Sequence, residues 1–160
     1  MQSKDLEKFG FSTWIKIVKD CDHNKDLILK LPRKKGVYVI RVDKLILRIK
    51  GESDIVYIGQ GKIQSRIQLL LRSYLPINFR NYSSKHTARE GFERILKETE
   101  LNLEFSYISI DVEETKANVL ELATCHSLEE NTVAKEIESR LLECYCKDHI
   151  EPPPLNNTRK

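Results

Sequence analysis

Three short segments rich in β-branched and aromatic residues follow one another in the first half of the chain, at residues 36–42, 45–49 and 55–58. Each has the length and composition of a β-strand. The connections between them are too short to contain a crossover helix, so neighbouring strands are expected to run antiparallel. This excludes a doubly wound nucleotide-binding fold and favours a small antiparallel sheet.

Apolar residues recur at helical spacing on both sides of these strands, and residues 101–110 alternate like one further strand. The segments expected to be helical are 4–20, 62–74, 87–99, 114–126 and a last helix from about Ser127 or Asn131 to about Asp148. The predicted fold is therefore α/β, of the α+β type, with a small central antiparallel sheet of about three strands flanked by helices.

The chain has 160 residues, which is enough for one compact domain with an apolar core. Residues 1–31 are expected to form an N-terminal helical extension and residues 32–160 the main domain, which ends in an extended proline-rich segment at 152–157. The charged first residues lack the apolar stretch of a secretion signal, and no apolar run could span a bilayer. We therefore expect a cytoplasmic protein. Its four cysteines, expected to be reduced thiols, are Cys21, Cys125, Cys144 and Cys146.

Charge is distributed unevenly along the chain. Residues 1–97 contain 21 Lys and Arg against 10 Asp and Glu, whereas residues 98–151 contain 4 against 14. This polarity favours a basic surface that binds a polyanion such as nucleic acid. The alternative is that these residues form solvated faces whose charges intermix once the chain folds.

Several common catalytic and binding motifs are missing from the sequence. Gly61-Lys62 is not part of a Walker phosphate loop, because Val56 stands where that motif needs its first glycine and Ile63 where it needs Ser or Thr. Gly59 and Gly61 do not continue into a dinucleotide-binding fingerprint. The cysteines include no CxxC pair, which excludes the common zinc patterns.

One set of residues remains that could carry chemistry. In chain order its members are Gly-Val-Tyr at 36–38, Tyr-Ile-Gly at 57–59, Arg66, Glu138 in a Glu-x-x-Leu-Leu sequence, and Asn156 after Pro-Leu. In this order and spacing, residues 36–156 resemble the GIY-YIG nuclease family. The resemblance implies a GIY-YIG-like fold that works as an Mg²⁺-dependent endonuclease on DNA, with RNA as the alternative substrate. The catalytic residues that it implies are Tyr38, Tyr57, Arg66, Glu138 and Asn156.

Phosphodiester hydrolysis fits these residue types. A carboxylate such as Glu138 is a hard oxygen ligand for one Mg²⁺, or for Mn²⁺ in its place. Arg66 carries a permanent charge and a planar fork of donors for phosphate oxygens. A tyrosine hydroxyl can orient the attacking water, although its ordinary pKa of about 10 makes it a poor base unless nearby cations stabilise the phenolate. The resemblance favours Tyr38 for this contact with water.

The sequence departs from the family pattern at two positions. Gln60 follows the second tripeptide where many members have lysine or another polar group, so that Lys62 is the nearest cation, and Leu70 lies one turn after Arg66 where many have tyrosine or histidine. The proton-transfer role is therefore unassigned, and Lys85 or His86 would take it if their loop folds back onto the site. The residues expected to contact nucleic acid are Lys34, Lys35, Lys62, Lys85 and His86.

Each of these residues also has an ordinary structural interpretation. Tyrosines in strands usually pack in half-buried layers, and a lone Arg66 or Glu138 would be a solvated helix residue. A lone Asn156 would be a turn or cap residue. Two other functions stay open: a nucleic-acid-binding module of the same fold without catalysis, and a protein-interaction domain whose charge recruits an acidic partner.

Overall fold

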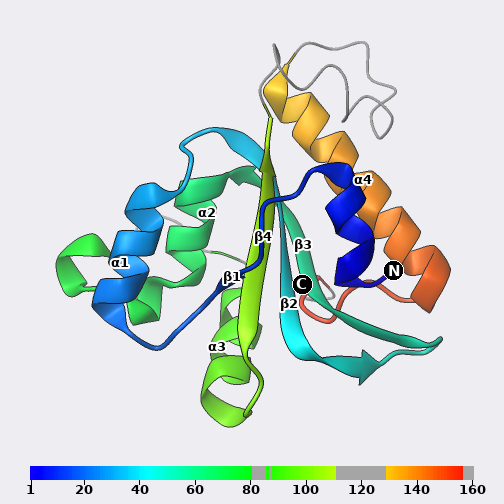
Figure 1. Ribbon diagram of the computed structural model, residues 1–160, viewed down its shortest axis with the longest axis horizontal. Helices are drawn as coiled ribbons and strands as arrows, with labels where there is room; N and C mark the ends of the chain where they lie inside the picture. Colours follow the sequence, from blue (N-terminus) through cyan, green and yellow to red (C-terminus); the bar gives the residue numbers. More distant parts are fainter. Residues whose placement is uncertain (81–85, 87, 111–128, 157–160) are drawn as a thin grey trace.

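The computed structural model describes residues 1–80, 86, 88–110 and 129–156, in which helices and strands are interspersed (Figure 1). This part of the chain contains four β-strands, four α-helices and three short 3-10 helices. In chain order they are η1 Ser3–Phe9, β1 Ile15–Lys16, α1 Cys21–Lys30, β2 Lys35–Leu47, β3 Glu52–Lys62, α2 Ile63–Leu70, η2 Arg72–Tyr74, η3 Ile77–Phe79, α3 Arg89–Glu98, β4 Leu103–Ser109 and α4 Glu130–His149.

The strands form one antiparallel sheet in the order β1-β4-β2-β3. β2 and β3 pair as the hairpin that their close spacing in the sequence predicts, so the expected antiparallel sheet of an α+β fold is confirmed. The sheet has four strands, and one of them, β1, was not expected from the sequence, because Ile15–Lys16 was predicted to be helical but pairs with β4.

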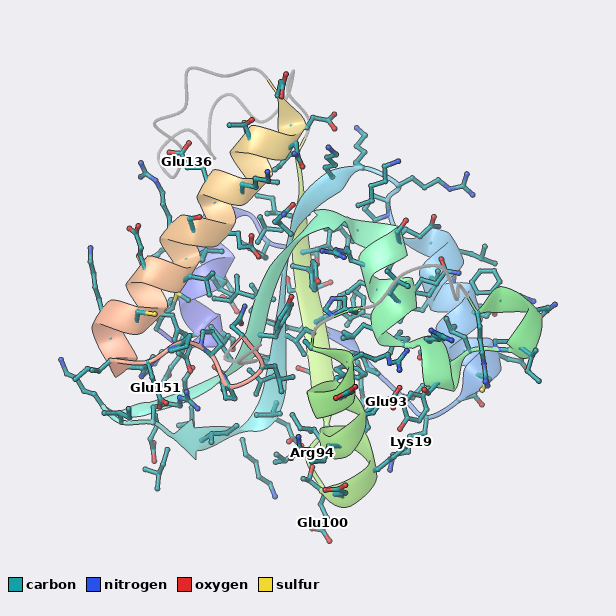
Figure 2. The ribbon with its side chains drawn as sticks, turned by 180° about the vertical axis from the view of Figure 1, so that it is seen from behind. Lys19, Glu93, Arg94, Glu100, Glu136 and Glu151 are labelled. Carbon is teal, nitrogen blue, oxygen red and sulfur yellow. The ribbon has the colours of Figure 1, made fainter. Side chains whose placement is uncertain are left out.

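Helices cover both faces of the sheet, with α1, α2 and α3 on one face and α4 and η1 on the other (Figures 1 and 2). Side chains alternate between the two faces along a strand. Tyr38 and Ile40 of β2 therefore enter one hydrophobic core, which we call the first core, while Val37 and Val39 enter the second core beneath α4.

The sequence prediction was wrong for residues 4–20, which do not form one helix. η1 ends at Gly10, whose φ of +75° is the left-handed conformation in which glycine commonly terminates helices. The chain then extends into β1, and the side chain of Asp20 caps the start of α1. Residues 1–31 are therefore no purely helical extension, since β1 is part of the sheet.

The two strands expected at 36–42 and 45–49 are parts of one long strand, β2. Its pairing with β3 changes register between Arg41 and Ile46. A bulge of this kind bends a strand without ending it, so the polar residues around Asp43 resemble a turn in the sequence although the strand continues.

The remaining described elements lie close to their predicted positions, and the strand at 101–110 and the helices at 62–74 and 87–99 are each present but shorter than predicted. The helix expected at 114–126 lies outside the described residues. The segment after α4 ends in a turn at 153–156 rather than in an extended form, with the Asn156 N–H donating to the Pro153 carbonyl. None of the helices described is both long and apolar enough to cross a membrane.

Candidate functional site

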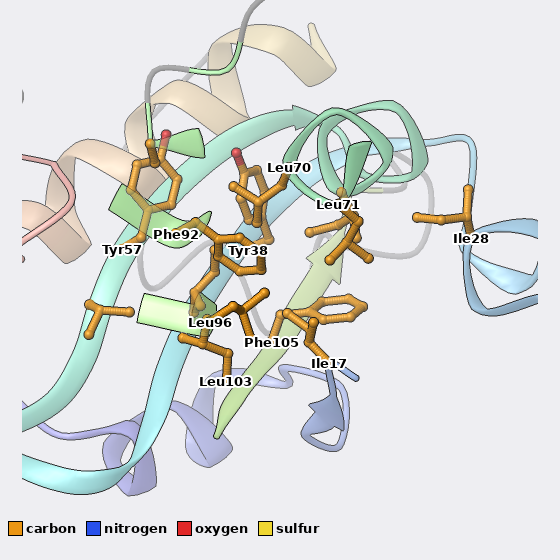
Figure 3. Close-up of a cluster of buried hydrophobic side chains, with 14 of the residues drawn as sticks. Ile17, Ile28, Tyr38, Tyr57, Leu70, Leu71, Phe92, Leu96, Leu103 and Phe105 are labelled. Carbon is orange, nitrogen blue, oxygen red and sulfur yellow. The ribbon is translucent and has the colours of Figure 1, made fainter. Parts of the chain in front are cut away.

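Tyr38 and Tyr57 lie side by side at the first core, with both hydroxyl groups pointing the same way (Figure 3). Tyr38 of β2 is opposite Gly59, and Tyr57 of β3 is opposite Ile40, so the tyrosines are diagonal neighbours. Their ring centroids are 5.8 Å apart, and the neighbouring Tyr57 raises the pKa of Tyr38. The prediction that the two tyrosines share one face of the sheet is confirmed.

Gly59 makes room for this pair. A Cβ atom at this position would lie 2.8 Å from the Tyr38 hydroxyl oxygen and 2.5 Å from Cε1 of Tyr57, closer than packed atoms allow. The Tyr-Ile-Gly sequence therefore requires its glycine for a steric reason, because any side chain there would push the two phenol rings apart.

His86 completes an aromatic cluster with the two tyrosines. Its Nε2 lies 2.6 Å from the Tyr38 hydroxyl oxygen, and its ring centroid lies 5.4 Å from that of Tyr57. The N–H of Ala88 donates to its Nδ1 at 3.2 Å. Burial, with a smaller contribution from the charge of Arg66, lowers the pKa of His86 to about 4, so the imidazole is neutral at neutral pH. The residue thus lies at the site, as expected if its loop folds back.

Arg66 lies in the first turn of α2, beside the end of β3. Its Nε donates to the Gln60 carbonyl oxygen at 3.2 Å. Gly61 leaves space for the side chain, because a Cβ atom there would lie 3.0 Å from both Cγ and Nε of Arg66. Its φ of +136° is also a conformation that favours glycine. The arginine is therefore held along the strand end.

Glu138 reaches the site from α4, the helix that packs on β2 and β3 from the opposite face of the sheet. Its neighbours Ile137 and Leu141 are buried in the second core, whereas Glu138 is half-buried. Burial raises the pKa of the Glu138 carboxyl above its ordinary value of 4.5, and the positive charge of Arg66 acts in the opposite direction. The carboxylate therefore lies within electrostatic range of the guanidinium.

The charge of Arg66 acts on three groups, because it lowers the pKa of Tyr38, His86 and Glu138. Burial, followed by the neighbouring Tyr57, nevertheless raises the pKa of Tyr38 well above 10. The phenol is therefore protonated at neutral pH, and any phenolate would need the stabilisation that nearby cations provide. Tyr38, Tyr57 and His86 thus lie in contact, and Arg66 of α2 and Glu138 of α4 lie within electrostatic range of Tyr38.

The donor set of this site suits Mg²⁺ better than zinc. Within the described ranges, no three His, Cys, Asp or Glu side chains come together as a metal-binding group. Mg²⁺ needs few protein ligands, because it keeps several of its waters and often binds through one or two carboxylates. Glu138 alone fits such an ion, and Mn²⁺ accepts the same oxygen ligands.

Asn156 is bonded to the backbone of β3. Its Oδ1 accepts from the Ile58 N–H at 2.9 Å, and its Nδ2 donates to the Ile58 carbonyl at 2.7 Å. The N–H of Leu155 donates to the Val56 carbonyl. Both ends of the amide thus hold the strand that carries Tyr57, which makes Asn156 a positioning residue in this structure rather than a group that faces a substrate.

Only some of the basic residues expected to bind nucleic acid lie together on one surface. Lys34 and Lys62 are exposed and Lys35 is half-buried, at the end of the β2–β3 pair nearest α2. Lys35 and Lys62 are directly opposite each other in the strand pairing, an arrangement of like charges that is unfavourable unless an anion neutralises it. Lys85 lies outside the described residues. The sequence suggested that His86 is part of this surface. His86 is instead buried against Tyr38.

The sequence pointed to Tyr38, Tyr57, Arg66 and Glu138 as a set, but it did not show how Gly61 and His86 lie against them. Gly61 lies five positions before Arg66, and only the folded strand end shows that it makes room for the arginine. His86 is 48 positions from Tyr38, so their contact has no local signal in the sequence. Comparisons of the chain with protein-family models, with curated proteins and with solved structures find no match.

Proposed function

We propose that this chain is a metal-dependent endonuclease of the GIY-YIG type, which hydrolyses phosphodiester bonds in DNA. One observation carries the proposal. Tyr57, Arg66 and Glu138 come from three elements other than that of Tyr38, yet each acts on the pKa of Tyr38, whose ring centroid lies 5.8 Å from that of Tyr57. These are the residue types that bind a phosphate, hold a hard cation and orient a water.

In this proposal, Arg66 binds oxygens of the scissile phosphate with its planar fork of donors. The tyrosine pair orients the attacking water. Glu138 would hold the divalent ion, which when bound neutralises charge at phosphorus and favours ionisation of a bound water. The raised pKa of Glu138 implies that its carboxyl binds a cation best after losing its proton, so activity should fall in acid.

Nucleic acid is favoured as the substrate by the basic residues beside the site. Lys34, Lys35 and Lys62 lie near the residues that precede Arg66, where they could contact the backbone on either side of a bound phosphate. Binding through such contacts releases counterions and weakens as salt concentration rises. A protein-interaction domain would not require a tyrosine pair close to Arg66 and Glu138, so this set of residues favours the nuclease.

The test is cleavage of supercoiled plasmid and branched DNA by the purified chain, with Mg²⁺, with Mn²⁺ and with EDTA. We expect nicking that requires a divalent ion and that Glu138→Ala abolishes. Glu143→Ala is the matched control, because it removes an exposed glutamate from the same helix and should leave cleavage unchanged. A single-stranded RNA arm tests the alternative substrate.

Circular dichroism and a thermal melt of each variant exclude unfolding as the cause of any loss. Cleavage that persists in EDTA or in Glu138→Ala would contradict the assignment of Glu138 as a metal ligand. Salt-sensitive DNA binding in a gel shift, without cleavage by the wild type, would instead indicate the binding module without catalysis. Absence of both cleavage and DNA binding would reject the nucleic-acid function altogether.

A further inference from the structure

The contacts of His86 indicate which of its ring nitrogens carries the proton. Its Nδ1 accepts a hydrogen bond from the backbone N–H of Ala88, so it has no hydrogen of its own. A neutral imidazole with an unprotonated Nδ1 carries its proton on Nε2. Because the ring is buried and neutral, the Nε2–H donates to the Tyr38 hydroxyl oxygen at 2.6 Å. His86 is a donor to Tyr38.

The direction of the His86–Tyr38 hydrogen bond determines where the hydroxyl proton of Tyr38 can go. Tyr38 is fully buried, so its own hydroxyl proton needs an acceptor inside the protein. The hydroxyl of the neighbouring Tyr57, whose ring centroid is 5.8 Å away and which raises the pKa of Tyr38, is the acceptor that we infer. The hydrogen bonds therefore run in one direction, from His86 to Tyr38 and from Tyr38 to Tyr57, and donors in such a chain polarise one another.

Exposure distinguishes the two tyrosines. Tyr57 keeps 8% of its surface exposed, whereas Tyr38 keeps 0%. We propose that Tyr57, rather than Tyr38, contacts the attacking water, and that His86 is a positioning residue that orders Tyr38 behind it. This inference rests on the nuclease function proposed above, and it revises the role that the sequence resemblance gave to Tyr38. It also makes His86 a hydrogen-bond donor to Tyr38 rather than a general base.

The first test reads the hydrogen-bond order without any cleavage assay. Long-range ¹H–¹⁵N correlation of ¹⁵N-labelled protein near neutral pH reports the tautomer of each histidine, and the spectrum of His86→Gln assigns the His86 signals. We expect an unprotonated Nδ1 and a protonated Nε2. A proton on Nδ1, or a fully protonated ring, would overturn the inference.

The second test compares cleavage rates of matched variants. Tyr57→Phe should lose about 10²-fold or more in kcat, as for removal of a group that handles the reacting water. Tyr38→Phe and His86→Phe should each lose only about tenfold, the effect of one hydrogen bond. His86→Gln should stay within about threefold of wild type, because its amide Nε2 can donate from the same place.

A double variant separates a positioning role from an independent one. If His86 acts only through Tyr38, Tyr38→Phe with His86→Phe should be no slower than Tyr38→Phe alone. A Tyr38→Phe variant slower than Tyr57→Phe would return the water contact to Tyr38. A His86→Gln variant as slow as His86→Phe would make His86 a base. If the wild type cleaves nothing, the nuclease proposal fails, while the spectrum still decides the hydrogen-bond order.

Discussion

The two faces of the sheet are built from the same strands but differ in what their cores contain. Beneath α4, the strand residues of the second core are aliphatic, as with Val37, Val39 and Ile58, and the buried Tyr145 of α4 donates its hydroxyl to the Ile55 carbonyl. On the other face, the first core combines aliphatic packing with the hydroxyls of Tyr38 and Tyr57, against which His86 lies.

The difference shows how one fold combines packing with a chemical site. Aliphatic side chains, which make up most of the second core, need no hydrogen-bond partners and tolerate changes of shape. Buried hydroxyls and an imidazole must each find a partner, so their positions are specified more narrowly. We therefore expect substitutions in the second core to change stability, and substitutions around the tyrosines to change rate.

The largest effect is expected for Leu141→Ala on the buried face of α4. Removing this side chain, which is 1% exposed, should reduce the free energy of unfolding by about 2 to 5 kcal/mol. The rate per folded molecule should stay near wild type, because Leu141 contacts the second core and not the tyrosines. Urea titration and kcat measured well below the melting temperature check both parts. A kcat that falls with unchanged stability would contradict the expectation that the second core affects stability and not rate.

Arg66→Lys should show the opposite pattern, with stability kept and rate lost. Lysine retains the charge but lacks the planar fork that binds two phosphate oxygens. We expect a loss on the order of 10²-fold in kcat, as for removal of one preorganised donor. Initial cleavage rates and a thermal melt measure the two quantities. A rate within about threefold of wild type would assign Arg66 to the solvated surface.

The pH dependence of stability should identify His86 as a buried neutral residue. Its pKa is about 4 in the folded protein against an ordinary 6.5, so the unfolded chain binds the proton more readily between these values. Stability should therefore be complete above about pH 6.5 and decrease as pH falls toward 4, by at most about 3 kcal/mol. Glu138 acts in the opposite sense, because its raised pKa favours the folded state below that pKa.

His86→Gln isolates the contribution of the histidine, because Glu138 is unchanged in both proteins. Urea titrations of the two proteins from pH 4 to 8 should show a steeper acid loss for the wild type. Parallel curves would mean that His86 is not buried as a neutral group.

The smallest effect is expected for Asn156→Ala. Losing the two hydrogen bonds to Ile58 should cost about 1 to 2 kcal/mol of stability and change kcat only a few-fold, since the amide faces the backbone of β3. Asn156→Asp keeps the acceptor and loses the donor, so its stability should be intermediate. A kcat lowered about 10²-fold in both variants would restore the catalytic role that the sequence suggested.

The sequence predicted the parts of the molecule that depend on local patterns. The β2–β3 hairpin follows from closely spaced strand segments, and α2 follows from the periodicity of Ile63, Ile67 and Leu70. β1 could not be predicted, because two residues carry no strand pattern and pair only once β4 offers an edge. The positions of His86 and Asn156 depend likewise on contacts between residues far apart in the chain, which a single sequence does not display.

The turn at 153–156 has a consequence for the behaviour of the protein in concentrated solution. β3 is an edge strand, and unpaired backbone groups on such a strand can recruit a strand from another molecule. The N–H of Leu155 and the amide of Asn156 take these groups at Val56 and Ile58. At the opposite edge, β1 is only two residues long and offers little for another strand to pair with. Within the described residues, the middle of the β3 edge is thus closed to pairing with a strand from another molecule.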